Sequence, residues 1–137
     1  MTEPQSTSPA AAPRRRGCGK PVLILLLLLL VAGGGFALYV WITLKYDYSE
    51  GERAGYVQKF SRKGWICKTW EGELAMSIVP GVTPTIWEFS VRDPAVVPAI
   101  SRAIGKRVVL HYAEHPGIPT SCFGQTVYFV HSVSVVP

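Results

Sequence analysis

The segment Val22–Leu44 constrains this chain more than any other feature of its sequence. It holds 23 residues without a charged side chain, and Leu25–Leu30 is six consecutive leucines. A bilayer hydrocarbon core of about 30 Å requires roughly 20 apolar residues of helix, at about 1.5 Å of rise each. The segment therefore predicts one transmembrane helix over residues 22–44, with a small domain on its C-terminal side.

The two flanks of this segment differ in charge. Arg14–Arg16 and Lys20 precede it, whereas basic and acidic side chains are mixed in the residues that follow. Since Lys and Arg are retained on the cytoplasmic side, we expect a cytoplasmic N-terminus and a C-terminal domain outside the cytoplasm. A cleaved signal peptide, with its cleavage site at Gly35-Phe36-Ala37, is the alternative, although the apolar character continues further than such a peptide requires.

Composition divides the rest of the chain into three parts. Residues 1–21 are rich in Pro, Ser, Thr, Ala and Arg and predict a disordered, basic cytoplasmic tail. Residues 45–54 predict a juxtamembrane linker, and residues 55–137 predict one small folded domain. From Lys45 onward ten Lys and Arg oppose eight Asp and Glu. This near balance lacks the basic stripe that duplex binding needs, so we expect no nucleic-acid partner.

Alternating apolar residues predict that this domain is mainly β. Five strands are expected, over residues 55–61, 65–76, 85–92, 106–113 and 125–136. Between the third and the fourth, apolar residues at spacings of three and four follow Asp93-Pro94 and predict one helix. This order matches an OB-like five-stranded β-barrel, the oligonucleotide/oligosaccharide-binding fold, with one helix between strands 3 and 4. A different small barrel or a rolled sheet is the alternative.

The outer domain contains two cysteines, Cys67 and Cys122. In an oxidising compartment this pair could form a disulfide. Two buried, unpaired thiols are the alternative, because the sequence does not give the distance between them.

Two groups of cysteine and histidine residues could bind a metal or act in catalysis. His111, His115, His131 and Cys122 could bind zinc, but no CxxC or HExxH spacing is present, so surface histidines are expected. Cys122 could act as a nucleophile with His115 as its base, yet no neighbouring positive charge would stabilise the thiolate. The sequence therefore predicts no catalytic, cofactor-binding or metal-binding residue.

The remaining candidates are carboxylates and tryptophans. Glu71 and Glu73 lie two residues apart on a predicted strand and share a face, where solvated charges are favoured over a glycosidase pair. Trp65 lies beside a turn and is expected to be exposed. We therefore expect a partner or ligand surface that includes Trp65, Glu71 and Glu73. The residues in phase with the core are Ile66, Trp70 and Trp87.

Four segments carry a resemblance to a known family: 48–74, Trp87–Val91, Gly105–Val109 and Pro119–Gly124. With them the chain resembles a family of small uncharacterised bacterial single-pass membrane proteins, over most of residues 45–133. The resemblance implies a bacterial inner membrane and a periplasmic outer domain. Relatives are often labelled 6-phosphogluconate dehydrogenase, and that label implies an NADP-dependent oxidation.

The residues of this chain favour a different function. No G-x-G-x-x-G turn lies between a strand and a helix, and no alternating strand–helix pattern is present to hold a dinucleotide. The sequence therefore favours a membrane-anchored, non-enzymatic accessory or binding module. Its periplasmic domain would bind a protein, a peptide or a glycan. An enzyme of the kind that the label implies is the alternative.

Overall fold

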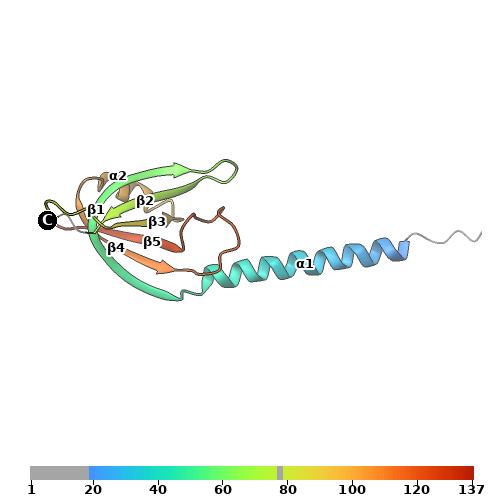
Figure 1. Ribbon diagram of the computed structural model, residues 1–137. Coiled ribbons are helices and arrows are strands. Elements are labelled where there is room, and N and C mark those ends of the chain that lie inside the picture. The colour runs from blue at the N-terminus through green and yellow to red at the C-terminus, as the bar shows by residue number, and fades with distance from the viewer. Residues whose placement is uncertain (1–18, 77–78) are drawn as a thin grey trace, which may run out of the picture. The chain divides into compact units, whose positions relative to one another are not determined.

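The computed structural model describes residues 19–76 and 79–137. Figure 1 shows the elements in chain order: α1 (Gly19–Lys45), β1 (Ser49–Lys63), β2 (Thr69–Ala75), β3 (Ile86–Val91), α2 (Val97–Arg102), β4 (Arg107–Glu114) and β5 (Tyr128–Val135). The chain divides into two units between Gly35 and Phe36, inside α1. The second unit contains the end of α1 and all five strands. Most of the predicted tail, residues 1–21, lies outside the described residues.

Helix α1 contains the predicted span, 22–44. It has 27 residues, none of them buried, and a length of about 40 Å at about 1.5 Å per residue. Lys20 and Lys45 lie near its two ends and bracket the uncharged stretch. The helix is long and apolar enough to cross a membrane, and a signal sequence near the N-terminus would have the same properties.

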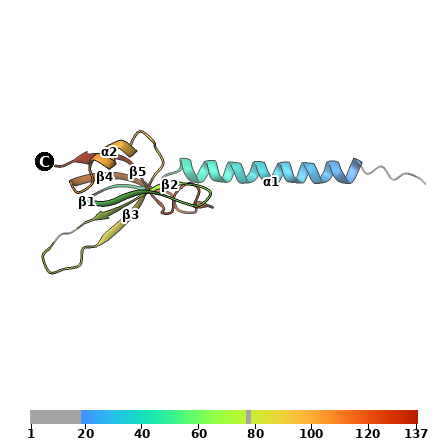
Figure 2. The same ribbon diagram turned by 90° about the horizontal axis from the view of Figure 1, so that it is seen from above.

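The five strands form a closed ring of hydrogen-bonded neighbours in the order β1-β2-β3-β5-β4. Strand β1 pairs with two others: residues 49–56 run antiparallel to β4, and most of residues 56–63 run antiparallel to β2. The sheet is mixed, because β3 and β5 are parallel where Ser90 meets Phe129. The prediction of five strands with a helix between the third and the fourth is confirmed. Figure 2 shows residues 79–85, which precede β3, projecting from the sheet.

The predicted linker, 45–54, is wrong over its second half, because β1 begins at Ser49. Acidic and glycine residues at positions 50–52 have low strand propensity, so no strand was expected there. In the structure this segment pairs with residues 111–113 of β4. A partner more than 50 residues away along the chain therefore outweighs the local preference.

The core lies inside the ring of strands and includes one residue of α2, Ile100. Its fully buried large apolar side chains are Val57, Leu74, Phe89, Ile100, Val108, Leu110 and Val130. Gly72 of β2 lies directly under the Phe89 ring, where a Cβ atom would collide with the ring. The close packing of β2 against β3 therefore requires glycine at this position.

Helix α2 is shorter than the pattern after Asp93 predicts. The Asp93 carboxylate accepts a hydrogen bond from the backbone N–H of Ala95 at 2.9 Å, and the helix begins only at Val97. Pro98 stands in the first turn, where its missing N–H leaves no hydrogen bond unmade. The proline therefore sets the start of α2 without kinking it.

The predicted core tryptophans lie as expected, but Ile66 does not. Trp87 is buried, and Trp70 is partly buried against the core. The prediction for Ile66 is wrong, because β2 begins only at Thr69 and residues 64–68 form a loop. Gly64 has a φ of 132°, a conformation that glycine adopts without strain, and it starts this turn.

Candidate binding site at two disulfide-linked loops

Two loops are joined covalently: residues 64–68, between β1 and β2, and residues 115–127, between β4 and β5. Cys67 and Cys122 form a disulfide between these loops, with their Cα atoms 4.9 Å apart. Of the two alternatives for these cysteines, the structure therefore shows the disulfide. Since Cys122 has no free thiol, it cannot act as the nucleophile considered from the sequence.

Glu71 fastens the 115–127 loop to the sheet. Its carboxylate accepts hydrogen bonds from Thr69 Oγ1 at 2.6 Å, from Ser90 Oγ at 2.6 Å and from the backbone N–H of Gln125 at 3.1 Å. Glu71 is only 4% exposed, so the prediction of a solvated charge on a ligand surface is wrong. The loop covers this face of β2, and three donors compensate the carboxylate for its lost hydration.

The other two residues of the predicted surface remain accessible. Trp65 is 100% exposed. Glu73 is partly exposed and forms an ion pair with Lys59, with Nζ and Oε1 3.4 Å apart. The structure therefore does not bring Trp65, Glu71 and Glu73 together as one surface.

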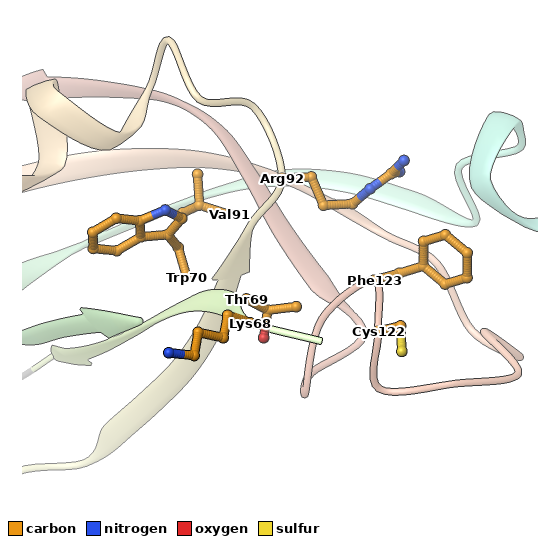
Figure 3. A pocket seen from close by; sticks show the side chains of 7 residues that line it. All are labelled: Lys68, Thr69, Trp70, Val91, Arg92, Cys122 and Phe123. Atoms are coloured by element: carbon orange, nitrogen blue, oxygen red, sulfur yellow. The ribbon is translucent and has the colours of Figure 1, made fainter. Parts of the chain in front are cut away.

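A pocket of about 200 Å³ lies between the start of β2, the end of β3 and the 115–127 loop (Figure 3). We call it the loop-end pocket, and it is lined by Lys68, Thr69, Trp70, Val91, Arg92, Cys122 and Phe123. Figure 3 shows Arg92 and Phe123 on one side and Trp70 on the other. The Arg92 guanidinium lies 5.9 Å from the centre of the Phe123 ring.

The lining of the loop-end pocket is positively charged. Lys68 and Arg92 are exposed and basic, and no lining residue is acidic. Neither cation takes part in an ion pair between the residues that the structure describes. Because guanidinium and ammonium groups bind carboxylates and aromatic rings bind flat apolar groups, the pocket is suited to an anionic ligand with apolar side groups.

Sequence reasoning missed most of this pocket. Cys122 was considered for the chemistry of its sulfur, and Trp70 was predicted to lie in the core. Lys68, Arg92 and Phe123 were not recognised as parts of one site. The available signal was a basic residue at the start of one predicted strand and another at the end of the next. Only the pairing of β2 with β3 places these two strand ends beside the same loop.

His115 is another residue whose exposure was predicted wrongly, since it was expected on the surface. It is 5% exposed, and its Nε2 lies 3.1 Å from the Asp47 carboxylate. Its Nδ1 lies 3.1 Å from the carbonyl oxygen of Thr43 and 3.2 Å from that of Tyr46. His115 therefore joins the start of the 115–127 loop to the C-terminal end of α1.

The other members of the histidine group are not drawn together around a metal site. His111 pairs instead with Glu52, with Nδ1 and Oε1 3.0 Å apart, and His131 is exposed. Within residues 19–76 and 79–137, no three His, Cys, Asp or Glu side chains are placed to hold a metal ion together.

A cluster of aromatic rings surrounds Arg53 of β1, away from the disulfide. The guanidinium carbon lies 4.9 Å from the ring centre of Trp87, 5.6 Å from that of Tyr112 and 5.8 Å from that of Tyr128. The three rings also contact one another, with centres 5.0 to 5.6 Å apart. Arg53 Nη1 also lies 3.3 Å from the sulfur of Met76. The cation that these three rings contact is therefore Arg53 of the same domain.

The fold and the pocket together define a small β domain whose strands close into a ring, preceded by an apolar helix. The chain belongs to the family described as "Domain of unknown function (DUF8785)", whose model matches residues 47–135. The matched range contains the whole ring of strands and excludes α1. No curated protein matches the chain, and no solved structure matches it.

Proposed function

We propose that the protein is a membrane-anchored, non-enzymatic binding module of a bacterial envelope. Helix α1 anchors it in the inner membrane with its N-terminus in the cytoplasm, and the β domain lies in the periplasm. The basic flank at Arg14–Arg16 supports this orientation. The Cys67–Cys122 disulfide supports an oxidising compartment for the domain, since such bonds are rare in the cytosol.

We further propose that the β domain is an OB-like barrel. Its closed ring of five strands and the helix between β3 and β4 support this assignment. OB-folds bind their ligands on the face formed by strands 2 and 3 and on the loops that join strands 1–2 and 4–5. The loop-end pocket lies where β2, β3 and the 115–127 loop meet, next to the loop between β1 and β2.

The ligand that we propose is an acidic segment of a partner protein. The observation that carries this proposal is the pair Lys68 and Arg92, two exposed cations in a pocket without an acidic lining residue. Trp70 and Phe123 provide apolar surface beside the two charges. A neutral glycan would leave both cations without a counter-charge, whereas a segment with Asp or Glu next to an aromatic residue uses all four side chains.

Peptide binding to the full chain in mild detergent tests this proposal. The probe is a fluorescent peptide of alternating Glu and Tyr, compared by anisotropy with a peptide of alternating Gln and Tyr. We expect binding of the acidic peptide alone, and its loss in the double variant Lys68→Glu, Arg92→Glu. The matched control is Arg102→Glu, Lys106→Glu, which changes two exposed cations outside the pocket and should retain binding. Equal binding of both peptides, or binding of neither, would contradict the proposal.

Two further measurements test the compartment and the absence of catalysis. In intact cells, a membrane-impermeant thiol reagent should label Cys67 and Cys122 only after reduction. Cys18, on the other side of the apolar segment, should stay unlabelled until lysis. Labelling of all three cysteines only after lysis would place the domain in the cytoplasm. The purified full chain should not oxidise 6-phosphogluconate with NADP, and turnover that survives repurification would favour the enzyme.

A further inference from the structure

Two large apolar side chains in the β1–β2 loop, residues 64–68, are almost entirely exposed. Trp65 is 100% exposed and Ile66 is 97% exposed; we call these two residues the tip. The tip follows Gly64 and directly precedes Cys67, whose disulfide fixes the loop to residues 115–127. A loop held in this way presents its apolar side chains constantly, so the tip has the character of a contact surface.

The residues around the tip are basic. Arg62, Lys63 and Lys68 lie within three positions of it, and residues 61–70 include no acidic residue. Tryptophan favours the headgroup zone of a bilayer, and Lys and Arg next to it are attracted to anionic phospholipids. The composition of this loop therefore matches the surface of an anionic membrane.

Contacts within Phe36–Pro137 connect the tip to the end of α1. The Tyr39 hydroxyl donates a hydrogen bond to the Gly117 carbonyl oxygen at 2.9 Å, and Cys122 of the same loop is bonded to Cys67. Five residues of extended chain span at most about 18 Å, which limits the distance from Gly117 to Cys122. The tip is therefore linked, through the disulfide, to the same loop that contacts the last turns of α1.

We propose that the tip inserts into the headgroup region of the bilayer that α1 crosses, with Arg62 and Lys63 on anionic phospholipid headgroups. The inference rests on the proposed membrane anchor. It gives the β domain a second attachment, which orients the loop-end pocket relative to the membrane surface. The occupant of the tip is thus lipid, and the acidic peptide segment belongs to the pocket.

Tryptophan quenching by lipid tests the proposal on the full chain in nanodiscs of phosphatidylcholine and phosphatidylglycerol. Brominated acyl chains quench tryptophans that enter the bilayer. The fluorescence lost in Trp65→Phe isolates the signal of Trp65, and the fluorescence lost in Trp41→Phe isolates that of Trp41 near the end of α1. We expect both signals to be quenched, and Trp65 emission to shift to shorter wavelength relative to detergent solution.

The two tryptophans separate two kinds of failure. Quenching of Trp41 without quenching of Trp65 would overturn the inference about the tip and leave the anchor standing. Quenching of neither would overturn the anchor and the inference with it. Both positions are exposed in the structure, so phenylalanine there should not disturb folding.

A charge comparison tests the lipid specificity of the tip. Quenching of Trp65 should be weaker in pure phosphatidylcholine than in discs with phosphatidylglycerol. The double variant Arg62→Gln, Lys63→Gln should lose this dependence on phosphatidylglycerol. The control Arg102→Gln, Lys106→Gln should keep it. The same dependence in both variants would contradict the assignment of Arg62 and Lys63 to anionic headgroups.

Discussion

Glu71 and Arg53 are two charged residues drawn into the same small ring of strands, and their surroundings differ completely. Glu71 lies under the 115–127 loop and accepts three hydrogen bonds at 2.6 to 3.1 Å. Arg53 lies among three aromatic rings at 4.9 to 5.8 Å and has no carboxylate partner in the described chain. Directional bonds thus compensate the first charge, and polarisable ring faces compensate the second.

This difference indicates in which part of the domain the loss of a single bonding group should reduce stability most. Hydrogen bonds and a disulfide have strict geometry, so removing one partner leaves the others unsatisfied. Ring faces tolerate displacement, because the attraction of a cation to a ring varies slowly with its position. We therefore expect changes at the disulfide-linked loops to cost more free energy of unfolding than changes in the aromatic cluster.

The largest effect is expected from the double variant Cys67→Ser, Cys122→Ser. The disulfide closes a loop of 55 residues, and the chain-entropy model gives about 4 kcal/mol for that length. Urea denaturation of the full chain in mild detergent, followed by circular dichroism, measures the loss. The wild type treated with dithiothreitol should behave like the variant, and an unchanged midpoint in both would show that the bond stabilises nothing.

The next effect is expected from Glu71→Ala. The hydroxyls of Thr69 and Ser90 and the N–H of Gln125 then lose a buried acceptor, at a cost of about 2–3 kcal/mol. The 115–127 loop should also loosen, which hydrogen exchange of its backbone amides measures. Thr69→Val removes one donor, a hydroxyl that bonds only to Glu71 among the described residues, and leaves the carboxylate two, so its cost should be smaller. Equal costs for the two variants would contradict the role given to Glu71.

The sequence predicted the number and order of the strands and the place of the helix, because their signal is local. Alternation over residues 85–92 and the turn at Gly64 are visible in a single segment. For residues that are buried by segments distant in the sequence, the predicted exposure was wrong. Glu71 is covered by a loop about 50 residues further on, and His115 meets the backbone of Thr43. Neither contact can be predicted from the periodicity or the spacing of residues along the chain.

The candidate site was predictable only in part, for the same physical reason. Cys67 and Cys122 were recognised as a pair that could bond, yet their distance is a property of the closed ring. Exposure of Trp65 was expected from its place beside a turn and is confirmed. The cations of the loop-end pocket come from two different strands, so no single stretch of sequence contains the site.

A smaller effect is expected in the aromatic cluster, from Arg53→Met. The change removes the cation and retains an unbranched apolar side chain among the rings, so the lost cation–π attraction should dominate, at about 1–2 kcal/mol. Arg53→Lys keeps a cation and should lose less. Fluorescence of Trp87, isolated by difference with Trp87→Phe, reports on the packing of the rings. If Arg53→Met were as costly as Glu71→Ala, the comparison between the buried Glu71 and the partly exposed Arg53 would fail.

The smallest effect is expected from Glu73→Gln, two residues from Glu71 on the same strand. Its ion pair with Lys59 is partly solvent-exposed, and surface pairs contribute about 0–1 kcal/mol. Glu73 also stands directly opposite Glu88 on β3, so neutralising it removes a repulsion as well as an attraction. The net change should be close to zero and should vanish in high salt. Glu71→Gln, measured beside it, changes the same chemical group on the same face. A large difference between these two variants would therefore measure the burial of Glu71 together with the hydrogen bonds that it accepts from Thr69, Ser90 and Gln125.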